Sequence, residues 1–203
     1  VTVTLALLMV YGIRLSGKKL PLLILPLTTI GYAAPGAVLG IGILVPLAFL
    51  DNWLADRVFD FTGYDPGLIF TGTAFAIILA YCVRFFSIAQ QTVDGALGRV
   101  SPSLPNAARS LGRNKLQVLW EIYRPLISAS TATALLLVFV DCVKELPATM
   151  LLRPFNFETL ATRVHVQASL EDLPNAAPGA ILIVLIGLCA VFLLAKVNKQ
   201  TSH

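Results

Sequence analysis

Apolar residues are grouped along this chain in long runs that are separated by short polar segments. The runs cover about residues 27–50, 67–86, 126–145 and 177–195, and residues 1–13 resemble the end of a fifth run. Because about 20 apolar residues in a helix cross roughly 30 Å of hydrocarbon, these runs predict helices that span a membrane. The pattern therefore indicates an all-α, polytopic transmembrane helix bundle with about five spans.

The composition agrees with this prediction. Hydrophobic residues make up 57% of the chain and charged residues 13%, whereas ordinary globular domains carry about 25% charged residues. The chain begins at Val1 inside an apolar run, without the basic segment and cleavage site of a signal peptide. We therefore expect residues 1–203 to form a single transmembrane domain that is a fragment of a longer protein.

Lys and Arg are distributed unevenly between the two sides of the predicted bundle. Segments assigned to the outside carry three of them: Arg57, Arg153 and Arg163. Segments assigned to the inside carry ten: Arg14, Lys18, Lys19, Arg99, Arg109, Arg113, Lys115, Arg124, Lys196 and Lys199. Short loops rich in Lys and Arg stay cytoplasmic, so we expect the N-terminus outside, the C-terminus in the cytoplasm, residues 51–66 outside and residues 87–125 inside. The net charge of +4 then reports topology and requires no nucleic-acid partner.

Proline and glycine interrupt the second predicted span, residues 27–50. Pro35 and Pro46 lie within it, and Gly36 and Gly40 form a G-x-x-x-G pair that lets another helix approach closely. In a segment this rich in glycine the same spacing also arises from composition alone. Specific helix packing and chance are therefore alternatives at this stage.

A polar and basic stretch, NAARSLGRNKLQVLWEIYRPL, occupies residues 106–126 between the third and fourth predicted spans. Ser103 is suited to cap a helix over residues 103–111, and Gly112 is suited to end it in a left-handed conformation. One apolar stripe is formed by Leu104, Ala107, Ala108 and Leu111. Such a helix either seats in a groove of another protein or lies flat on the membrane surface. The residues expected to pack on the bundle after it are Leu116, Leu119, Ile122 and Tyr123.

The spacing in this stretch resembles the cytoplasmic-loop signature of binding-protein-dependent ABC importer permeases: Glu-Ala-Ala, three residues, Gly, nine residues, Ile, one residue, Leu-Pro. The positions that match in register are Ala107, Ala108, Gly112, Ile122 and Pro125. Asn106 stands where Glu is usual, and Arg124 stands where Leu is usual. The resemblance implies the helix bundle of a type I ABC importer permease. It also implies that the loop couples to an ATPase through Asn106, Ala107, Ala108, Arg109, Leu111, Gly112, Ile122 and Pro125.

Two further blocks, residues 25–44 and 139–169, resemble ferric-iron importer permeases. Members of that group often fuse two permease halves, and this chain resembles the C-terminal half. The resemblance implies a cell inner membrane protein that takes ferric iron from a periplasmic binding protein. It also implies a second permease half or copy, and ABC ATPase subunits whose closure moves helix 103–111. The alternatives are a permease for thiamine, a polyamine or an oxyanion, or a channel-like subunit without ATP coupling.

Three ionisable residues, Asp141, Lys144 and Glu145, lie near the outer end of the fourth predicted span. Their spacing allows Lys144 to pair with Asp141 and leaves Glu145 free. Charged groups at membrane depth usually face a cavity or one another. The cluster is therefore predicted to be either a structural ion pair or part of the translocation path.

No other motif points to catalysis or to a metal site. The stretch GIRLSGKK, residues 12–19, departs from a phosphate-binding loop at Lys19, where Ser or Thr must bind magnesium, and is interpreted as a basic membrane anchor. Cys82, Cys142 and Cys189 lie in separate spans and are expected to be buried structural residues. We therefore predict neither an enzyme nor a bound cofactor or metal.

Overall fold

The computed structural model describes residues 1–16 and 25–201, and within these ranges the secondary structure is helical. The elements, in chain order, are α1 (Thr2–Ser16), a 3-10 turn (Leu25–Thr29), α3 (Ile30–Ala33), α4 (Gly36–Thr62), α5 (Ala74–Gly98), α6 (Ser103–Ser110), α7 (Lys115–Val118), a π-helical turn (Leu119–Tyr123), α8 (Arg124–Lys144), α9 (Pro147–Leu152), α10 (Leu160–Ser169) and α11 (Leu173–Thr201). Four helical segments of the described chain are long and apolar enough to span a membrane, namely α4, α5, the continuous segment from α7 to α8, and α11. The shorter apolar helix α1 accompanies them, so the all-α bundle is confirmed.

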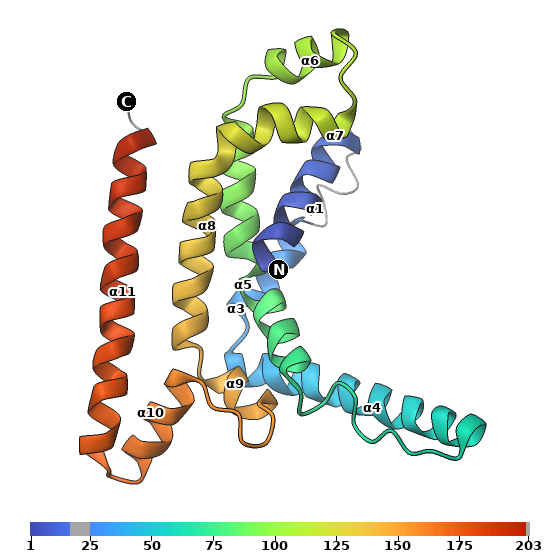
Figure 1. Cartoon of the computed structure of the whole chain (residues 1–203), viewed down its shortest axis with the longest axis vertical. Coiled ribbons are helices and arrows are strands. Elements are labelled where there is room, and N and C mark those ends of the chain that lie inside the picture. Colours follow the sequence, from blue (N-terminus) through green and yellow to red (C-terminus); the bar gives the residue numbers. More distant parts are fainter. Residues whose placement is uncertain (17–24, 202–203) are drawn as a thin grey trace.

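Helix α5 is the centre of the bundle, because both α1 and α8 pack against it (Figure 1). One buried cluster, at the level of the α1 N-terminus, is rich in small residues: Val3, Ala6, Phe85, Ala89, Ala134 and Val138. A second cluster, nearer α6, contains Val10, Val93, Ala96, Leu97 and Ile127. Small side chains let helix backbones approach closely, which compensates for the weak hydrophobic driving force inside a membrane. Helix α11 stands beside α8, and α4 leaves the bundle at its far end (Figure 1).

The second predicted span, residues 27–50, is not a single helix. The chain breaks at Ala34, whose ψ of 138° is extended, as expected for a residue that precedes proline. Helix α4 then continues past Pro46 to Thr62, so most of the segment 51–66 is helical where the sequence predicted a loop. It ends at Gly63, which takes the left-handed conformation with φ of 68°.

The other helix boundaries also differ from the limits of the apolar runs. Helix α5 starts later than the run at residue 67 and continues to Gly98, beyond the run's end at residue 86. Likewise, α7, the π-helical turn and α8 form one continuous segment from Lys115 to Lys144. The segment 146–176, which lies between the last two apolar runs, contains α9 and α10. An apolar run marks the part of a helix that lies in hydrocarbon, and a helix continues past it wherever no residue ends it.

The G-x-x-x-G pair packs α4 against the region of α9. An ideal Cβ atom at Gly36 would lie 2.7 Å from Oε1 of Glu145, and one at Gly40 would lie 2.9 Å from Cδ1 of Leu151. These distances are shorter than van der Waals contacts allow, so a larger residue at either position would force the side chain of Glu145 or Leu151 to move. Of the two alternatives, specific packing rather than chance explains this pair.

A buried carboxylate fixes the connection between α4 and α5. Asp51 is fully buried, and its oxygens accept hydrogen bonds from the backbone N–H groups of Ile69, Phe70 and Thr71 at 2.6 to 3.2 Å. Three N–H groups that would otherwise lack a partner are thereby satisfied. The loop before α5 is thus attached to the middle of α4.

Candidate functional site

Helix α6 lies at one end of the bundle, and α9 and α10 lie at the opposite end (Figure 1). The predicted helix 103–111 is found as α6, Ser103–Ser110. The expectation that Ser103 caps it is wrong, because Pro102 occupies the N-cap position with helical dihedral angles and no side-chain cap forms. The Ser103 hydroxyl instead shares a hydrogen bond of 2.8 Å with the hydroxyl of Ser101.

The end of α6 is a tight, fully hydrogen-bonded turn. Gly112 has φ of 85°, as the sequence predicted. The N–H of Arg113 donates to the carbonyl of Ala108 at 3.1 Å, and the N–H of Gly112 donates to the carbonyl of Arg109 at 3.0 Å. This pair of bonds is the Schellman motif. No heavy atom lies within 4 Å of an ideal Cβ at Gly112, so backbone conformation alone demands glycine there.

The two sides of α6 have different surroundings. The predicted apolar stripe is largely exposed: Leu104 is 48% and Leu111 84% exposed, Ala107 is also exposed, and Ala108 is half-buried. A cavity of about 320 Å³ lies between α6 and the ends of α1 and α7. On the α6 side it is lined by one face of the helix, at positions i, i+3, i+4 and i+7: Pro102, Pro105, Asn106 and Arg109. Asn106 and Arg109, expected in the coupling surface, therefore lie on the face turned toward the bundle.

A continuous helical segment connects the α6 turn to the bundle. Asn114 starts α7 with a capping box, in which its side chain and that of Gln117 each accept from the other's backbone N–H. Val118 and Leu119 are buried, whereas Leu116 is 67% exposed, so the prediction that Leu116 packs on the bundle is wrong. Helix α7 is attached to α1 through a backbone group, because the Tyr11 hydroxyl of α1 donates to the carbonyl of Lys115 at 2.5 Å.

The remaining signature residues lie where this segment enters the bundle. Ile122 is half-buried in the π-helical turn, and Pro125 is exposed in the first turn of α8. A π-helical turn inside an α-helix often marks a functional position, because its wider hydrogen bonding interrupts the regular ladder. The signature thus extends from the exposed α6 to the first turn of a span-length helix.

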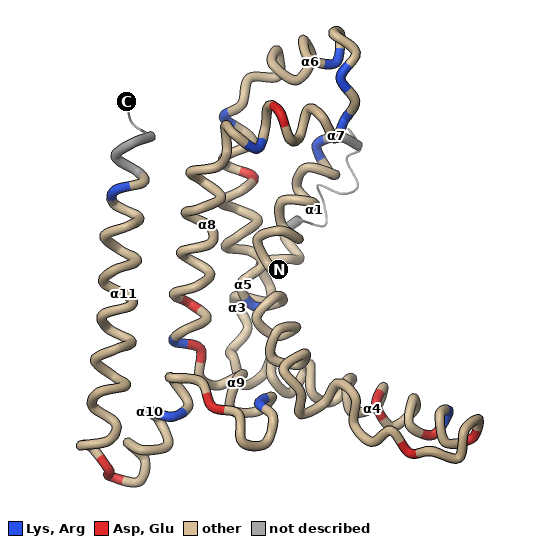
Figure 2. The backbone as a smooth tube through the Cα atoms, in the orientation of Figure 1, with Lys and Arg blue, Asp and Glu red and all other residues tan. Residues whose placement is uncertain are grey.

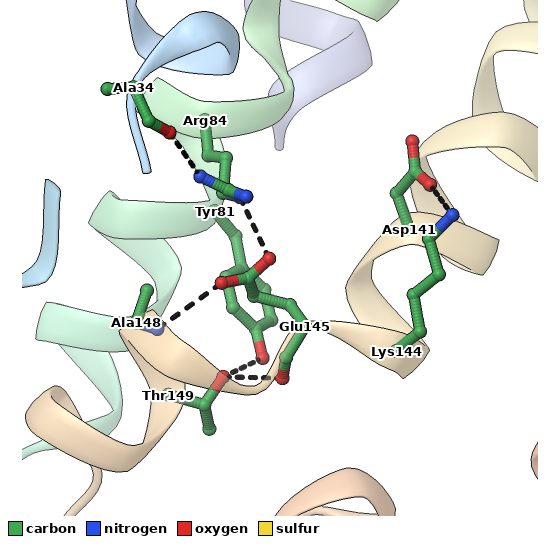
Figure 3. Close-up of polar contacts among 8 residues, drawn as sticks. All are labelled: Ala34, Tyr81, Arg84, Asp141, Lys144, Glu145, Ala148 and Thr149. Atoms are coloured by element: carbon green, nitrogen blue, oxygen red, sulfur yellow. Dashed lines mark hydrogen bonds and ion pairs between the residues drawn. The ribbon is translucent and has the colours of Figure 1, made fainter. Parts of the chain in front are cut away.

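The charged cluster is organised differently from the prediction (Figure 3). Lys144 pairs with Asp141 at 2.6 Å, which confirms the predicted ion pair. Glu145 is not free: its Oε2 lies 2.8 Å from Nε of Arg84, and the residue is only 6% exposed. The prediction missed this partner because Arg84 belongs to α5, far away in the sequence. The available signal was an arginine within an apolar run, which is costly unless it is paired.

Arg84 and Glu145 connect the two places where span-length helices are interrupted (Figure 3). Arg84 donates from Nη1 to the carbonyl of Ala34 at 2.8 Å, at the break before α4. Glu145 accepts from the N–H of Ala148 at 3.3 Å, at the break between α8 and α9. Thr149 is also buried there, and its hydroxyl donates to the Glu145 carbonyl at 3.0 Å. Backbone groups freed by helix breaks at membrane depth are thus satisfied inside the protein.

The other candidate residues do not form a site. Among residues 1–16 and 25–201, no group of three or more His, Cys, Asp or Glu side chains is close enough to hold a metal ion. Cys82 and Cys142 are half-buried, but Cys189 is exposed on α11, so the expectation of burial is wrong for it, because α11 packs on one side only. Of the stretch 12–19, the first part belongs to α1 and residues 17–19 lie outside the described residues.

Span-length helices, together with helix breaks that are joined by a buried ion pair, are the features of a polytopic membrane protein. The chain belongs to the family of binding-protein-dependent transport system inner membrane components, which matches residues 2–203. Members of this family are membrane subunits of transport systems, which agrees with the prediction that the chain is not an enzyme.

Similar proteins include both iron and phosphonate permeases. The Fe(3+)-transport system permease protein FbpB 2 of Haemophilus influenzae is 36% identical over 124 residues, which cover 61% of this chain and 24% of that protein. The putative ferric transport system permease protein FbpB 1 of the same organism is 28% identical over 175 residues, covering 84% of this chain and 26% of that protein. The putative 2-aminoethylphosphonate transport system permease protein PhnV of Salmonella typhimurium is 27% identical over 167 residues, covering 82% and 56%. The chain thus spans about a quarter of the length of the ferric relatives.

Proposed function

We propose that this chain is one permease half of an ATP-driven importer, that its solute is ferric iron delivered by a periplasmic binding protein, and that α6 couples it to a separate ABC ATPase. The family of binding-protein-dependent components supports the first part, and the two ferric relatives support the solute. A second permease half, fused or separate, completes the pathway. The chain crosses the inner membrane with its N-terminus outside and α6 and its C-terminus in the cytoplasm.

The exposed apolar stripe of α6 is the observation that carries the coupling proposal. None of the four apolar side chains of the stripe is buried: Leu104, Ala107 and Leu111 are exposed, and Ala108 is half-buried. Two of the four, Ala107 and Ala108, are small. A ridge of small residues lets a helix sit deep in a groove of another protein. Such a stripe at the end of a membrane bundle is the surface expected for a docking helix.

The connection from α6 to the bundle supplies the mechanical link. Movement of α6 is passed through the Schellman turn at Gly112 and the capping box at Asn114 into the segment Lys115–Lys144. Rigid-body movement of a helix requires close packing where force enters and a stiff continuation where it leaves. ATPase closure would therefore tilt α8 and, through Glu145 and Arg84, shift the breaks at the far end of the bundle.

The charged cluster then has two roles. Glu145, buried against Arg84, holds the breaks together, so its role is structural. Asp141 and Lys144 are the members left for the translocation path, because the Lys144 side chain is 63% exposed. A permease needs only weak contact with its solute, since tight binding would prevent release.

The PhnV relative supports a second candidate solute, a phosphonate oxyanion, because its similarity covers 82% of this chain, about as much as the 84% covered by the ferric relative FbpB 1. The two candidates are separated by which loaded binding protein stimulates ATP hydrolysis by the complex. Stimulation by the iron-loaded protein alone is the expected result, and stimulation by the phosphonate-loaded protein alone would replace ferric iron with phosphonate as the solute.

The docking of α6 is tested by changing its stripe. Ala108→Trp adds a large side chain on the ridge, which we expect to separate the interface and to abolish copurification of the ATPase. Gly112→Val disfavours the left-handed turn and should redirect the chain that leaves α6, with weakened copurification. Ala177→Trp, an exposed alanine of α11 at the opposite end, is the matched control and should retain the ATPase. Normal copurification by Ala108→Trp would remove the assignment of α6 as the docking helix.

A further inference from the structure

The cavity behind α6 is lined by several cationic side chains together with polar and apolar ones. It has a volume of about 320 Å³, and three basic residues, Arg14, Arg109 and Lys115, line it together with Tyr11 and Asn106. Among residues 1–16 and 25–201, no carboxylate lines it. Figure 2 shows Lys and Arg gathered at this end of the molecule, around α6, α7 and the end of α1. A cavity with several cations and no acidic residue is complementary to an anion.

Two of these cations have no carboxylate partner within the part of the chain that the structure describes. Arg14 pairs with Asp94 at 2.8 Å, whereas neither Arg109 nor Lys115 forms a salt bridge there. Arg113, in the same loop but outside the cavity, pairs with Glu121 at 3.1 Å. Asn106, which stands where the loop signature has Glu, leaves the cavity without a built-in negative charge.

The cavity lies at the level where a membrane's headgroups are expected. Trp120 is exposed, and the guanidinium of Arg124 lies 4.9 Å from its ring centre, a combination typical of the membrane interface. A second groove, apolar and also of about 320 Å³, is lined by Leu7, Trp120 and Ile127 among others. Leu7 and Ile127 are one helical turn from Tyr11 and Tyr123, which line the basic cavity. A basic cavity is thus followed by an apolar groove in the direction of the hydrocarbon.

We propose that this cavity binds the phosphate headgroup of an anionic phospholipid, with an acyl chain in the groove beside Leu7 and Ile127. Arg109 and Lys115 contact the phosphate, and Asn106 donates to it from its amide. The bound lipid takes the place of the carboxylate that the loop signature would provide at position 106. It connects the inner face of α6 to α1 and α7, while the apolar stripe on the other side stays open for the ATPase. The site is independent of the proposed transport function, because it needs only this chain and a membrane.

The experiment measures lipid binding by the full-length protein without any ATPase. Purified protein is titrated with phosphatidylglycerol in detergent, and bound lipid is counted by native mass spectrometry. The double variant Arg109→Gln/Lys115→Gln should bind about 30-fold more weakly, because each basic residue near a phosphate contributes about one factor of five to six. Asn106→Glu should also lower binding, because its carboxylate fills the cavity with fixed negative charge.

Matched controls separate this site from general attraction to a basic surface. Arg113→Gln removes a cation from the same loop but not from the cavity, and should leave phosphatidylglycerol binding unchanged. Phosphatidylcholine, which has no net charge, should bind far more weakly to the unmodified protein. Equal losses in Arg113→Gln and in the double variant would overturn the proposal, as would undiminished binding by the double variant. Inorganic phosphate that competes as well as phosphatidylglycerol would assign the cavity to free phosphate instead of lipid, and would also overturn it.

Discussion

At the scale of single residues, the buried ion pair of Arg84 and Glu145 stabilises the two helix breaks, one at Ala34 and the other between α8 and α9. Taking charges out of water is costly, so removal of one partner leaves the other uncompensated and destabilises by about 3–5 kcal/mol. Glu145→Gln and Arg84→Met should each lower the unfolding temperature in detergent. The double variant should be less destabilised than the sum of the two, with a coupling free energy of about 1–3 kcal/mol. Strictly additive effects would show that the pair does not act as a unit.

Gly36 is the second residue with a specific packing role, because an ideal Cβ atom there would lie 2.7 Å from Oε1 of Glu145. Gly36→Val should destabilise the protein by about 1–3 kcal/mol and disturb the ion pair, since the added atoms overlap the carboxylate. Gly42→Val is the matched control on the same helix, where nothing lies within 4 Å of an ideal Cβ. Thermal unfolding of both variants checks this prediction. Equal stability of the two would contradict the close packing of α4 against the α8–α9 junction.

The sequence predicted contacts between residues close in the chain better than contacts between distant residues. The pair of Asp141 and Lys144 follows from helical spacing, and the left-handed Gly112 follows from its place after a helical stripe. The partner of Glu145 lies on another helix, and no local pattern identifies which helices meet. Asn106 and Arg109 were assigned to the correct helix, but which of its faces turns to the bundle depends on how the loop folds back.

At the scale of elements, α4 and its loop depend on Asp51. Its carboxylate accepts from three backbone N–H groups of residues 69–71, so Asp51→Asn, which keeps size but removes the charge, should loosen this loop. We expect faster amide hydrogen exchange at Ile69 and Thr71 in the variant. Asp56→Asn, an exposed acidic residue on the same helix, should leave exchange unchanged. Unchanged exchange in Asp51→Asn would show that the loop is fixed by other contacts.

Hydropathy located the helices but not their ends or breaks. The apolar runs predicted every span-length helix, because burial in hydrocarbon requires them. They did not predict the continuation of α4 through residues 51–62, where charged residues alternate with aromatic ones that a helix accommodates outside hydrocarbon. They also missed the break at Ala34, although Pro35 was the available signal. The α9 and α10 helices are too short for hydropathy to detect.

At the scale of the whole molecule, the distribution of Lys and Arg predicts the orientation in the membrane. Single cysteines placed at Asp60 and at Gln117, in a background without Cys82, Cys142 and Cys189, should react with an impermeant reagent from opposite sides. The α4 end should be labelled from outside, and the α7 end only after the membrane is opened. Labelling of both positions from the same side would contradict the proposed topology.

The family could be identified from the sequence because its loop signature has fixed spacing, and the family match over residues 2–203 confirms it. The solute and the partners could not be derived in the same way. Weak contacts with a solute require no fixed residue spacing, and a docking helix shows only one side of an interface. The chain covers only 24% and 26% of the two ferric relatives, so their solute and partners come to this chain as proposals.

ATP-driven import of ferric iron coupled through α6 can be tested by measuring iron uptake and ATP hydrolysis in the same preparation. The permease, its second half and the ATPase are reconstituted in proteoliposomes with the iron-loaded binding protein. We expect ATP-dependent uptake by the unmodified complex and by Ala177→Trp. Gly112→Val should sharply lower the iron imported per ATP hydrolysed, while the chain remains inserted. Unchanged uptake per ATP in Gly112→Val, or iron uptake that does not require ATP, would show that α6 does not couple ATP hydrolysis to ferric import.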